Sequence, residues 1–378
     1  MGANKDRDGN YSSQPLFNTS NYVWGNALAV GMAQTALANT NLSWETTYKA
    51  NIGVDFGILK NRLSGTIDVF NNRTVDILID LPAPAVHGTS SIPRQNSATM
   101  TNKGIELSLE WNDRIGDFGY GIKGNFTYIK NKVTKFKGDD YSLSGATYIK
   151  EGYAVKSQYL LRVDRIIQTD EDLKIVEDMV ANNKNAFAAF GVPQKGDLLY
   201  KDLNGDGIID NKDKEVVSHG DRPTYQFGLS PHITYKGFDF SFLLQGQADI
   251  KVFWQTAAYN TPTVRYGYQL NKEVVEGRWY EGRTDATYPR LLVSTDSRNT
   301  QLSDFYLQNK AYLKIKNIQL GYEVPRSIAN KLFMERLRIY GSLENFFTFT
   351  KYKGLDPEVS GVAYPTIKQA VVGINLSF

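Results

Sequence analysis

The feature that most constrains the fold of this chain is an alternation of side chains with a period of two. In the clearest segment, two sets fall on opposite faces: Phe238, Phe240, Phe242, Leu244, Gly246 and Ala248 against Asp239, Ser241, Leu243, Gln245 and Gln247. This period predicts a β-strand with one apolar and one largely polar face. Many such segments reach about ten residues, which exceeds the usual soluble strand and matches a tilted strand that crosses a bilayer.

The alternating segments predict nine strands, near residues 47–59, 62–76, 103–112, 119–134, 224–235, 238–253, 310–322, 336–350 and 367–378. Short connections at 59–62, 112–117 and 235–238, and a somewhat longer one at 323–335, alternate with very long ones. Short turns at one end and long loops at the other are typical of outer-membrane barrels. We therefore predict an all-β fold: part of an antiparallel transmembrane β-barrel with long external loops.

The longest connection, 135–223, is predicted to be one large external excursion. Its segment Tyr159–Ile167 could form a further strand, but a single extra crossing would leave the next strand starting on the wrong side. Nine crossings are an odd number, whereas single-chain bacterial barrels have even numbers and leave no strand edge open. We therefore expect that the chain is the C-terminal part of something larger, or that its counterpart is a separate chain.

Composition argues against several other classes of protein. Lys and Arg total 43 against 40 Asp and Glu, so a net charge of +3 does not indicate a nucleic-acid partner. There is no cysteine, and the three histidines lie far apart without metal-ligand spacing. No apolar run approaches the roughly 18 residues of a transmembrane helix, and the polar residues after Met1 do not form a signal peptide. The 23 Tyr, 19 Phe and 32 Gly favour strands and turns.

One metal-binding pattern is present, in the segment DLNGDGIIDNKD at Asp202–Asp213. It matches the calcium loop of helix-loop-helix proteins, except that the last acid is Asp instead of Glu, and no amphipathic helix enters it. The expected cofactor is one Ca²⁺. Its expected ligands are the carbonyl of Ile208 and the side chains of Asp202, Asn204, Asp206, Asp210 and Asp213. The alternative is a plain surface turn, because Asn-Gly and Asp-Gly are strong turn formers.

Two patterns in the sequence resemble enzyme sites, but neither has the context that such a site requires. The segment GYGIKG (Gly119–Gly124) matches a dinucleotide fingerprint, but the alternation continues through it, so its glycines belong to a strand. Glu106 and Glu110 share a strand face about 13 Å apart, whereas glycosidase carboxylates lie within about 9.5 Å. The sequence also lacks G-x-S-x-G and H-E-x-x-H motifs. We therefore predict that the chain is not an enzyme.

Several long segments resemble the C-terminal end of SusC-like TonB-dependent transporters (the SusC/RagA family). They are Asn41–Asp80, Asn102–Trp111, Gly196–Asp213, Gly277–Leu291, Tyr312–Pro325, Leu337–Val359 and Ala370–Phe378. The resemblance covers nearly the whole chain and implies that residues 1–378 are the C-terminal part of a barrel of about 22 strands. It also implies an N-terminal plug domain, which is absent from this sequence and would lie upstream of residue 1.

The resemblance further implies a function and partners. The expected function is import of oligosaccharides or peptides across the cell outer membrane, with a SusD-like surface lipoprotein over the barrel mouth and energy from TonB acting on the plug. Outer-membrane lipid would surround the strands. The alternative is a soluble, calcium-stabilised, β-rich surface protein that binds glycans or acts as an adhesin. The C-terminal Phe378, with its alternating apolar neighbours, resembles the signal read by the barrel-assembly machinery and favours the transporter.

Overall fold

The structure is a computed structural model that describes residues 2–4, 14–81, 94–137, 141–256, 260–264, 266–267, 269–293, 296–359, 361 and 363–378. The chain forms two compact units. The first unit comprises Met1–Tyr141, Ile149–Val155 and Phe227–Ile233, and the second comprises Ser142–Tyr148, Lys156–Gln226 and Thr234–Phe378. Each unit contains long antiparallel strands, and the second also carries a folded region built from long connections.

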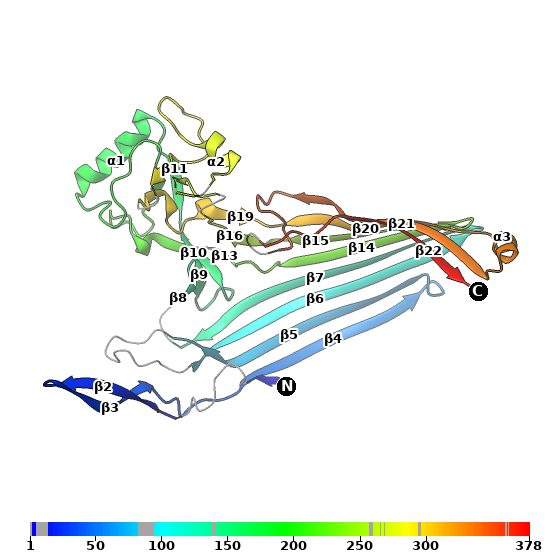
Figure 1. Cartoon of the computed structure of the whole chain (residues 1–378), viewed down its shortest axis with the longest axis horizontal. Helices are drawn as coiled ribbons and strands as arrows, with labels where there is room; N and C mark the ends of the chain where they lie inside the picture. Colours follow the sequence, from blue (N-terminus) through cyan, green and yellow to red (C-terminus); the bar gives the residue numbers. More distant parts are fainter. Residues whose placement is uncertain are drawn as a thin grey trace. The chain divides into compact units, whose positions relative to one another are not determined.

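The first unit is a sheet of long strands in the order β1-β4-β5-β6-β7-β14 (Figure 1). These strands are β1 (Gly2–Asn4), β4 (Glu45–Ile58), β5 (Leu63–Ile79), β6 (Gln95–Ile115), β7 (Phe118–Phe136) and β14 (Tyr225–Tyr235). The pairs from β4 to β7 are antiparallel and join neighbours in the sequence. Tight turns connect them at one end, with Leu59, Lys60 and Asn61 in the left-handed backbone region.

The second unit contains a matching antiparallel set in the order β15-β20-β21-β22. These strands are β15 (Phe238–Ala248), β20 (Tyr312–Glu323), β21 (Arg336–Thr350) and β22 (Gln369–Ser377). The connection from β20 to β21 holds the short helix α3 (Arg326–Ala329) and the 3₁₀ turn η5 (Asn330–Leu332). All nine predicted strands are therefore present, and β1 adds a short tenth that the sequence did not predict.

Two predicted boundaries were wrong for local reasons. Strand β6 begins at Gln95 rather than near residue 103, because the polar residues before Lys103 still pair with β5 and β7. Strand β15 ends at Ala248 rather than at residue 253, because Asp249 has a φ of 53° and breaks the extended backbone. The residues beyond it form β16 (Lys251–Phe253), which pairs with β19 (Leu307–Asn309).

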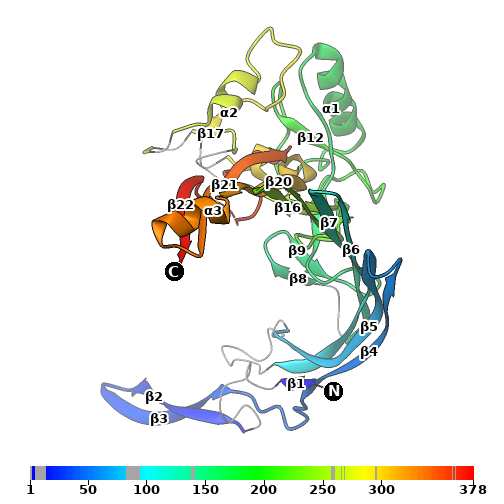
Figure 2. The ribbon, with the colours of Figure 1, turned by 90° about the vertical axis from the view of Figure 1, so that its right-hand side faces the viewer.

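A hairpin near the N-terminus was not predicted at all. Strands β2 (Leu16–Trp24) and β3 (Ala27–Ala36) pair with each other (Figure 2), with Gly25 in the left-handed region at their turn. Its larger apolar side chains, such as Trp24 at 77% exposure, are open to solvent in the described structure. Mixed small and polar residues hid the alternation of this hairpin in the sequence.

The long connections of the second unit fold into their own small domain. It contains α1 (Asp170–Asn182), α2 (Lys272–Gly277), the 3₁₀ turns η2 (Asn211–Asp213), η3 (Arg298–Thr300) and η4 (Asp304–Tyr306), and short strands. The strands are β8 (Tyr141–Ser144), β9 (Thr147–Ile149), β10 (Ser157–Leu161), β11 (Val163–Ile166), β12 (Leu198–Tyr200), β13 (Lys214–Ser218), β17 (Thr263–Val264) and β18 (Leu292–Val293). No helix in the described part of the chain is long and apolar enough to cross a membrane.

The segment Tyr159–Ile167 divides between β10 and β11, which pair with β9, β13 and β12. Neither strand belongs to the long sheets, and the external location of 135–223 stays a prediction. Residues 138–140 of the predicted excursion lie outside the described residues. Helix α1 begins with a capping box, in which Thr169 and Asp172 bind each other's backbone N–H groups.

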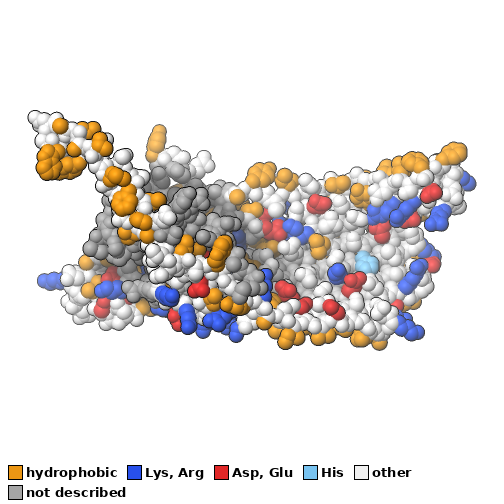
Figure 3. Space-filling view, turned by 90° about the horizontal axis from the view of Figure 1, so that it is seen from below, with side chains coloured by type: hydrophobic (Ala, Val, Ile, Leu, Met, Phe, Trp, Pro, Cys, Tyr) orange, Lys and Arg blue, Asp and Glu red, His pale blue; other side chains and the backbone are white. Residues whose placement is uncertain are grey.

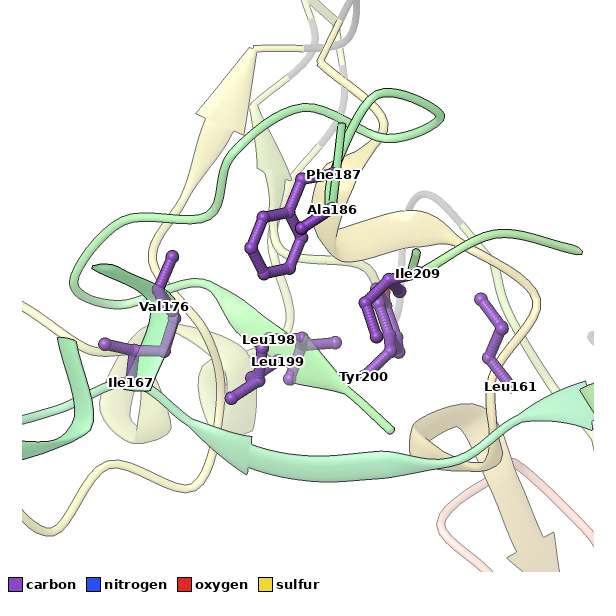
Figure 4. Packing of buried hydrophobic residues seen from close by; sticks show 9 residues of the cluster. All are labelled: Leu161, Ile167, Val176, Ala186, Phe187, Leu198, Leu199, Tyr200 and Ile209. Carbon is purple, nitrogen blue, oxygen red and sulfur yellow. The ribbon is translucent and has the colours of Figure 1, made fainter. Parts of the chain in front are cut away.

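The small domain formed by the long connections of the second unit, which we call the loop domain, has a hydrophobic core of its own (Figure 4). The core gathers Leu161, Ile167, Val176, Ala186, Phe187, Leu198, Leu199, Tyr200 and Ile209. Ile167, Val176 and Ile209 are each no more than 1% exposed, and Ile209 comes directly from the predicted calcium loop. The described residues of these connections are therefore held together by apolar burial as well as by hydrogen bonds.

Candidate functional site

Side chains of β4 to β7 lie in rows across the first unit, because the registers pair residues level with one another. On one face, four successive rows are apolar or Gly: Ile58-Leu63-Trp111-Ile122, Phe56-Gly65-Leu109-Gly124, Val54-Ile67-Leu107-Phe126 and Ile52-Val69-Ile105-Tyr128. Ile52 is 79% exposed and Val54 is 58% exposed. No described part of the protein covers this apolar face, which is what a lipid-facing surface requires.

The opposite face of the same strands is polar. Its rows include Gly57-Ser64-Glu110-Lys123, Asp55-Thr66-Ser108-Asn125 and Gly53-Asp68-Glu106-Thr127. Thr66 donates to Asp55 at 2.6 Å, and Asn51 donates to Asp68 at 3.0 Å. Figure 3 shows charged side chains spread over the face of the protein that it presents. Such a face can line an aqueous passage and offer hydrogen bonds to a polar solute.

The second unit has the same two faces and one close ion pair on the polar side. Phe238, Phe240 and Phe242 pair with Tyr322, Leu320 and Ile318 on the apolar face. On the polar face, the Arg338 guanidinium binds both oxygens of Asp239, with Nε–Oδ1 at 2.9 Å and Nη2–Oδ2 at 2.5 Å. The pair spans strand β20, and a Cβ at Gly321 would lie 2.5 Å from both side chains. Gly321 therefore makes the pair possible, which the sequence alone does not reveal.

The predicted calcium loop lies within the loop domain as one ordered segment. Gly207 has a φ of +74°, as the bend requires. Asp202 accepts hydrogen bonds from the N–H groups of Gly205 (2.7 Å) and Gly207 (2.8 Å), and Asp206 accepts one from Ile208 at 2.9 Å. Asn204 donates to Asp206 at 3.1 Å. The residues at the first half of the loop thus lie together around a tight turn.

The end of the loop closes back on its start. Asp213 is fully buried, accepts from Leu203 N at 2.9 Å and Asn204 N at 3.3 Å, and accepts from Asp210 N at 2.8 Å. Asp210 in turn accepts from Lys212 N at 2.6 Å. Within the described residues, no three His, Asp or Glu side chains form a group that could hold a metal ion. The loop is therefore closed here by backbone donors, and calcium binding stays a prediction.

A buried carboxylate that sequence analysis missed joins two connections of the loop domain. Asp197 is 0% exposed, and its oxygens accept from Arg290 Nε (2.7 Å), Arg290 Nη2 (3.0 Å) and Asn299 Nδ2 (3.0 Å). Its Oδ2 also accepts from the N–H of Gln194 at 2.9 Å and lies 3.5 Å from Arg298 Nη1. A fully desolvated carboxylate needs such complete pairing, so Asp197 fixes the segment before β12 against the loop before η3.

A second missed cluster fixes the loop between β21 and β22. Lys314 in β20 is 1% exposed, and its Nζ lies 2.7 Å from Glu358, 3.3 Å from Asp356 and 2.6 Å from Thr366. An ammonium group has three hydrogens to donate, so each has an acceptor here. Lys316 adds contacts to Glu358 at 2.9 and 3.1 Å, which balances two cations against two carboxylates. We call these five residues the Lys314 cluster.

The electrostatics of the Lys314 cluster predict a pH dependence. Burial by itself would raise the pKa of the Glu358 carboxyl, but hydrogen bonds from Lys314 and Lys316 outweigh burial and lower that pKa below its ordinary value. The stabilisation is therefore complete above the ordinary glutamate pKa of about 4.3 and is lost as the pH falls through the lowered value. We expect Glu358→Gln to reduce amide hydrogen-exchange protection of residues 363–368 equally from pH 7 to 5, and progressively less below about pH 4. A difference that grows on acidification would contradict this pairing.

The second unit also contains a small pocket of about 220 Å³. Its lining includes Asn260, Tyr288, Phe305, Gln308 and Lys353. The Lys353 ammonium lies 5.6 Å from the centre of the Tyr288 ring and forms an ion pair with Glu273. Amides, a cation and aromatic rings are groups that orient polar ligands in binding sites.

The two patterns that suggested enzymes are strand residues, as expected. Gly119–Gly124 lies inside β7, with no helix following it, and Gly121 packs closely against His232. Glu106 and Glu110 both lie in β6, opposite Thr127 and Lys123 on the polar face. Glu110 accepts a hydrogen bond from Asn112 at 2.7 Å and lies 3.9 Å from Lys123. These carboxylates belong to the polar wall of the sheet.

Comparison with known proteins agrees with this two-faced sheet. Residues 9–346 match the family model described as TonB dependent receptor-like, beta-barrel. TonB-dependent receptor P39 of Formosa agariphila is 27% identical over 99% of the chain, and TonB-dependent receptor SusC of Bacteroides thetaiotaomicron is 27% identical over 90%. The relatives are receptors, not enzymes. The chain spans 39% of the length of P39 and 32% of the length of SusC.

Solved structures give the same result. The structure of the RagAB peptide transporter contains a chain that matches 98% of this one with a TM-score of 0.75 and 27% sequence identity. This chain covers 39% of that chain. The family is an outer-membrane family, and the TM-score shows that the fold described above matches part of the relative's chain. The chain therefore belongs to the TonB-dependent receptor-like β-barrel family.

Proposed function

We propose that this chain forms part of an outer-membrane importer for oligosaccharides or peptides. The polar faces of the long strands line the passage, and the apolar faces contact lipid. The region 135–223 lies outside the cell, a SusD-like lipoprotein covers the mouth, and TonB supplies energy through a plug domain. Support comes from similarity to SusC and to the RagAB peptide transporter, and from the separation of apolar and polar rows on β4 to β7.

The apolar rows carry this proposal. Four consecutive rows without a charge, exposed on the surface of a sheet, would be an aggregation hazard in a soluble protein, whereas a bilayer covers them. This observation also disfavours the alternative of a soluble surface protein, which would need to cover the same face with protein. The polar side then supplies the hydrogen-bonding wall that a hydrophilic nutrient needs.

Uptake measurements test the import function directly. In the bacterium that carries the gene, a deletion strain and a complemented strain are compared for uptake of labelled oligosaccharides and labelled peptides. We expect the deletion to abolish uptake of at least one class, and a protonophore to abolish the same uptake in the complemented strain. Equal uptake by the two strains, for the oligosaccharides and for the peptides, would overturn the proposal.

Phe240 provides a test of the lipid-facing surface. Phe240 lies in β15 on the apolar face, is 36% exposed, and is paired with Leu320. We expect Phe240→Arg to destabilise the membrane-inserted protein by about 2–4 kcal/mol if the position lies near the midplane of the bilayer, because the guanidinium must enter hydrocarbon. The measurement is the free energy of unfolding by denaturant in lipid vesicles, compared between the variant and the natural protein.

Ser241→Arg is the matched control for this substitution. Ser241 is the next residue on β15 and pairs with Gln319 on the polar face. The same guanidinium should be tolerated there, with a loss below about 1 kcal/mol. Equal losses for the two variants, or labelling that shows the Phe240 position open to water in the assembled protein, would contradict the orientation.

We also propose that the loop Asp202–Asp213 binds one Ca²⁺ ion. Its support is the register of oxygen-bearing side chains at Asp202, Asn204, Asp206, Asp210 and Asp213, together with the Ile208 carbonyl and the bend at Gly207. Binding would exchange some carboxylate contacts with backbone N–H groups for contacts with the ion. Affinity in the millimolar range is expected, as for other extracellular calcium modules.

Asp206→Ala tests the calcium loop. The substitution removes one oxygen ligand, so we expect the calorimetric heat of millimolar calcium binding to fall several-fold relative to the natural protein. Asp178→Ala is the control, because Asp178 is an exposed acid of α1 in the same unit and outside the loop. Identical heats for all three proteins would leave only a tight turn at this position.

A further inference from the structure

The apolar face of the first unit ends in a band of cations, which we call the basic band. It consists of Arg73 in β5, Lys103 in β6, and Lys130 and Lys132 in β7. The registers place these side chains in the two rows directly beyond the apolar ones, Ala50-Asn71-Lys103-Lys130 and Tyr48-Arg73-Thr101-Lys132. The band therefore continues the lipid-facing surface and not the polar wall.

The basic band has no counter-charge among the residues that the structure describes. All four side chains are exposed, and none of them makes an ion pair within the described part of the chain. The six apolar-face rows of β4 to β7, from Ile58 to Lys132, contain no Asp or Glu. At the turn end of the same strands, by contrast, Arg62 is paired with Asp113 at 3.3 Å. The four cations of the basic band therefore form the group of adjacent Lys and Arg residues on this face that lies without an acid in the same rows.

One pair in the band is unfavourable by itself. Lys103 and Lys130 lie directly opposite each other in the register of β6 and β7. Like charges at such positions repel and destabilise a strand pair. An anion bound between the two ammonium groups would convert this repulsion into two attractive contacts. The chemistry of the band therefore fits a ligand with concentrated negative charge, such as a phosphate group.

The height of the band indicates where that anion comes from. Successive rows on one face are about 6.6 Å apart along a strand, so the four apolar rows span roughly 20 Å between their Cα atoms. With their side chains, they approach the roughly 25 Å apolar belt of a membrane barrel. Tyr128 closes the last apolar row and Tyr48 lies beside Arg73, as expected for aromatic residues at an interface. The basic band then lies level with the lipid headgroups at the loop end.

We propose that the basic band binds the phosphate groups of an anionic glycolipid in the outer leaflet of the membrane. This inference rests on the proposed insertion of the strands in the outer membrane and adds a lipid site to it. Clusters of four or more Lys and Arg residues at a membrane surface attract anionic headgroups in this way. The lipid would neutralise the Lys103–Lys130 repulsion and stabilise the register of β5, β6 and β7.

The test uses the natural protein in nanodiscs of neutral lipid containing a small fraction of bisphosphorylated lipid A. Bound lipid is counted by native mass spectrometry. The variant Arg73→Gln/Lys103→Gln/Lys130→Gln/Lys132→Gln should bind this lipid at least about tenfold more weakly. Lys49→Gln is the matched control, because Lys49 lies at the same height of the sheet on the polar face, level with Asn72. It should bind as well as the natural protein.

A second variant keeps the test informative if the quadruple variant fails to assemble. Lys103→Gln/Lys130→Gln removes the repelling pair, so assembly should be unimpaired while lipid binding falls several-fold. The variant Lys103→Arg/Lys130→Arg/Lys132→Arg keeps the charge and should retain binding. Dephosphorylated lipid A should bind the natural protein as weakly as phosphorylated lipid A binds the quadruple variant.

Several results would overturn the lipid site. They are equal binding by the natural protein and the Gln variants, equal binding of phosphorylated and dephosphorylated lipid A, and displacement of the lipid by millimolar inorganic phosphate. Membrane fractionation separates this failure from that of the proposed function. If the protein fractionates with the outer membrane but binds phosphorylated and dephosphorylated lipid A equally, only the proposed lipid site is wrong. A protein that is recovered without detergent contradicts membrane insertion itself.

Discussion

Lys314→Met will destabilise the loop between β21 and β22 by about 3 kcal/mol, because it leaves buried carboxylates without their main cation. Lys314 Nζ contacts Glu358 at 2.7 Å and Asp356 at 3.3 Å, and the side chain is 1% exposed. Met preserves most of the length and volume of the side chain, so the loss reports charge and hydrogen bonding more than packing. The expected readout is faster amide exchange in residues 351–359 and 363–368 of the natural protein in detergent.

Lys316→Met is the control for Lys314→Met. Lys316 contacts the same Glu358 at 2.9 Å, but its side chain is 26% exposed, so water can replace part of the lost contact. A loss below about 1 kcal/mol is expected for it. Adding Asp356→Asn to Lys314→Met should recover part of the stability by removing an unpaired charge. Equal effects of the two lysine substitutions, or no recovery, would show that Lys314 acts through packing alone.

Asp197→Ala will open the loop domain, with an expected loss of about 3–5 kcal/mol. The substitution leaves the Arg290 guanidinium, whose side chain is 26% exposed, without its carboxylate, and it removes the acceptor of Nδ2 of the fully buried Asn299. Arg298 keeps Asp296, which lies beside it, and so is less affected. The measurement is hydrogen exchange in β12 and η3, where protection should fall together because Asp197 joins these segments.

The control for Asp197→Ala is an exposed acid with the same partner type and distance. Asp285 lies 2.7 Å from Arg283, as Asp197 does from Arg290, but its side chain is 82% exposed whereas that of Asp197 is 0% exposed. Asp285→Ala should therefore cost less than about 1 kcal/mol. Local loss of protection limited to residues next to position 197 would contradict its role in joining the two connections.

Both clusters bear on the proposed function because they hold the loop regions of the second unit. The Lys314 cluster fixes the connection from β21 to β22 against β20, and Asp197 fixes the excursion after β7 against the connection after β15. Loops that must present a binding surface need such rigid supports, since disordered loops would lose entropy on binding. The clusters are therefore positioning elements for these loops.

The long strands could be predicted from sequence because their pattern is local. Each residue from Phe238 to Phe242 lies on the apolar or the polar face according to its parity, so the alternation predicts both the strand and the orientation of its side chains. In the structure, consecutive strands joined by short turns pair with each other, as an antiparallel barrel portion requires. Residues such as Gly119–Gly124 were identified as strand by the same local argument.

Exceptions to the alternation needed the tertiary structure. Asn345 is a polar residue at an apolar position in the sequence, and it has a φ of 57° beside a register shift between β20 and β21. Its side chain donates to the carbonyl of Ile367 at 3.1 Å. A bulge of this kind is decided by two strands together, so the sequence of one strand does not predict it.

The sequence by itself determined the two-faced strands, their approximate lengths and the composition of each face. It could do so because alternation with a period of two relates residues that are close along the chain. Only the tertiary structure decided which distant residues meet: Asp197 with Arg290, Lys314 with Glu358, and Lys103 with Lys130. The calcium pattern was visible because its residues are contiguous, whereas the buried ion pairs join different connections. Contacts between charged residues far apart in sequence depend on strand register and loop packing, which no local pattern encodes.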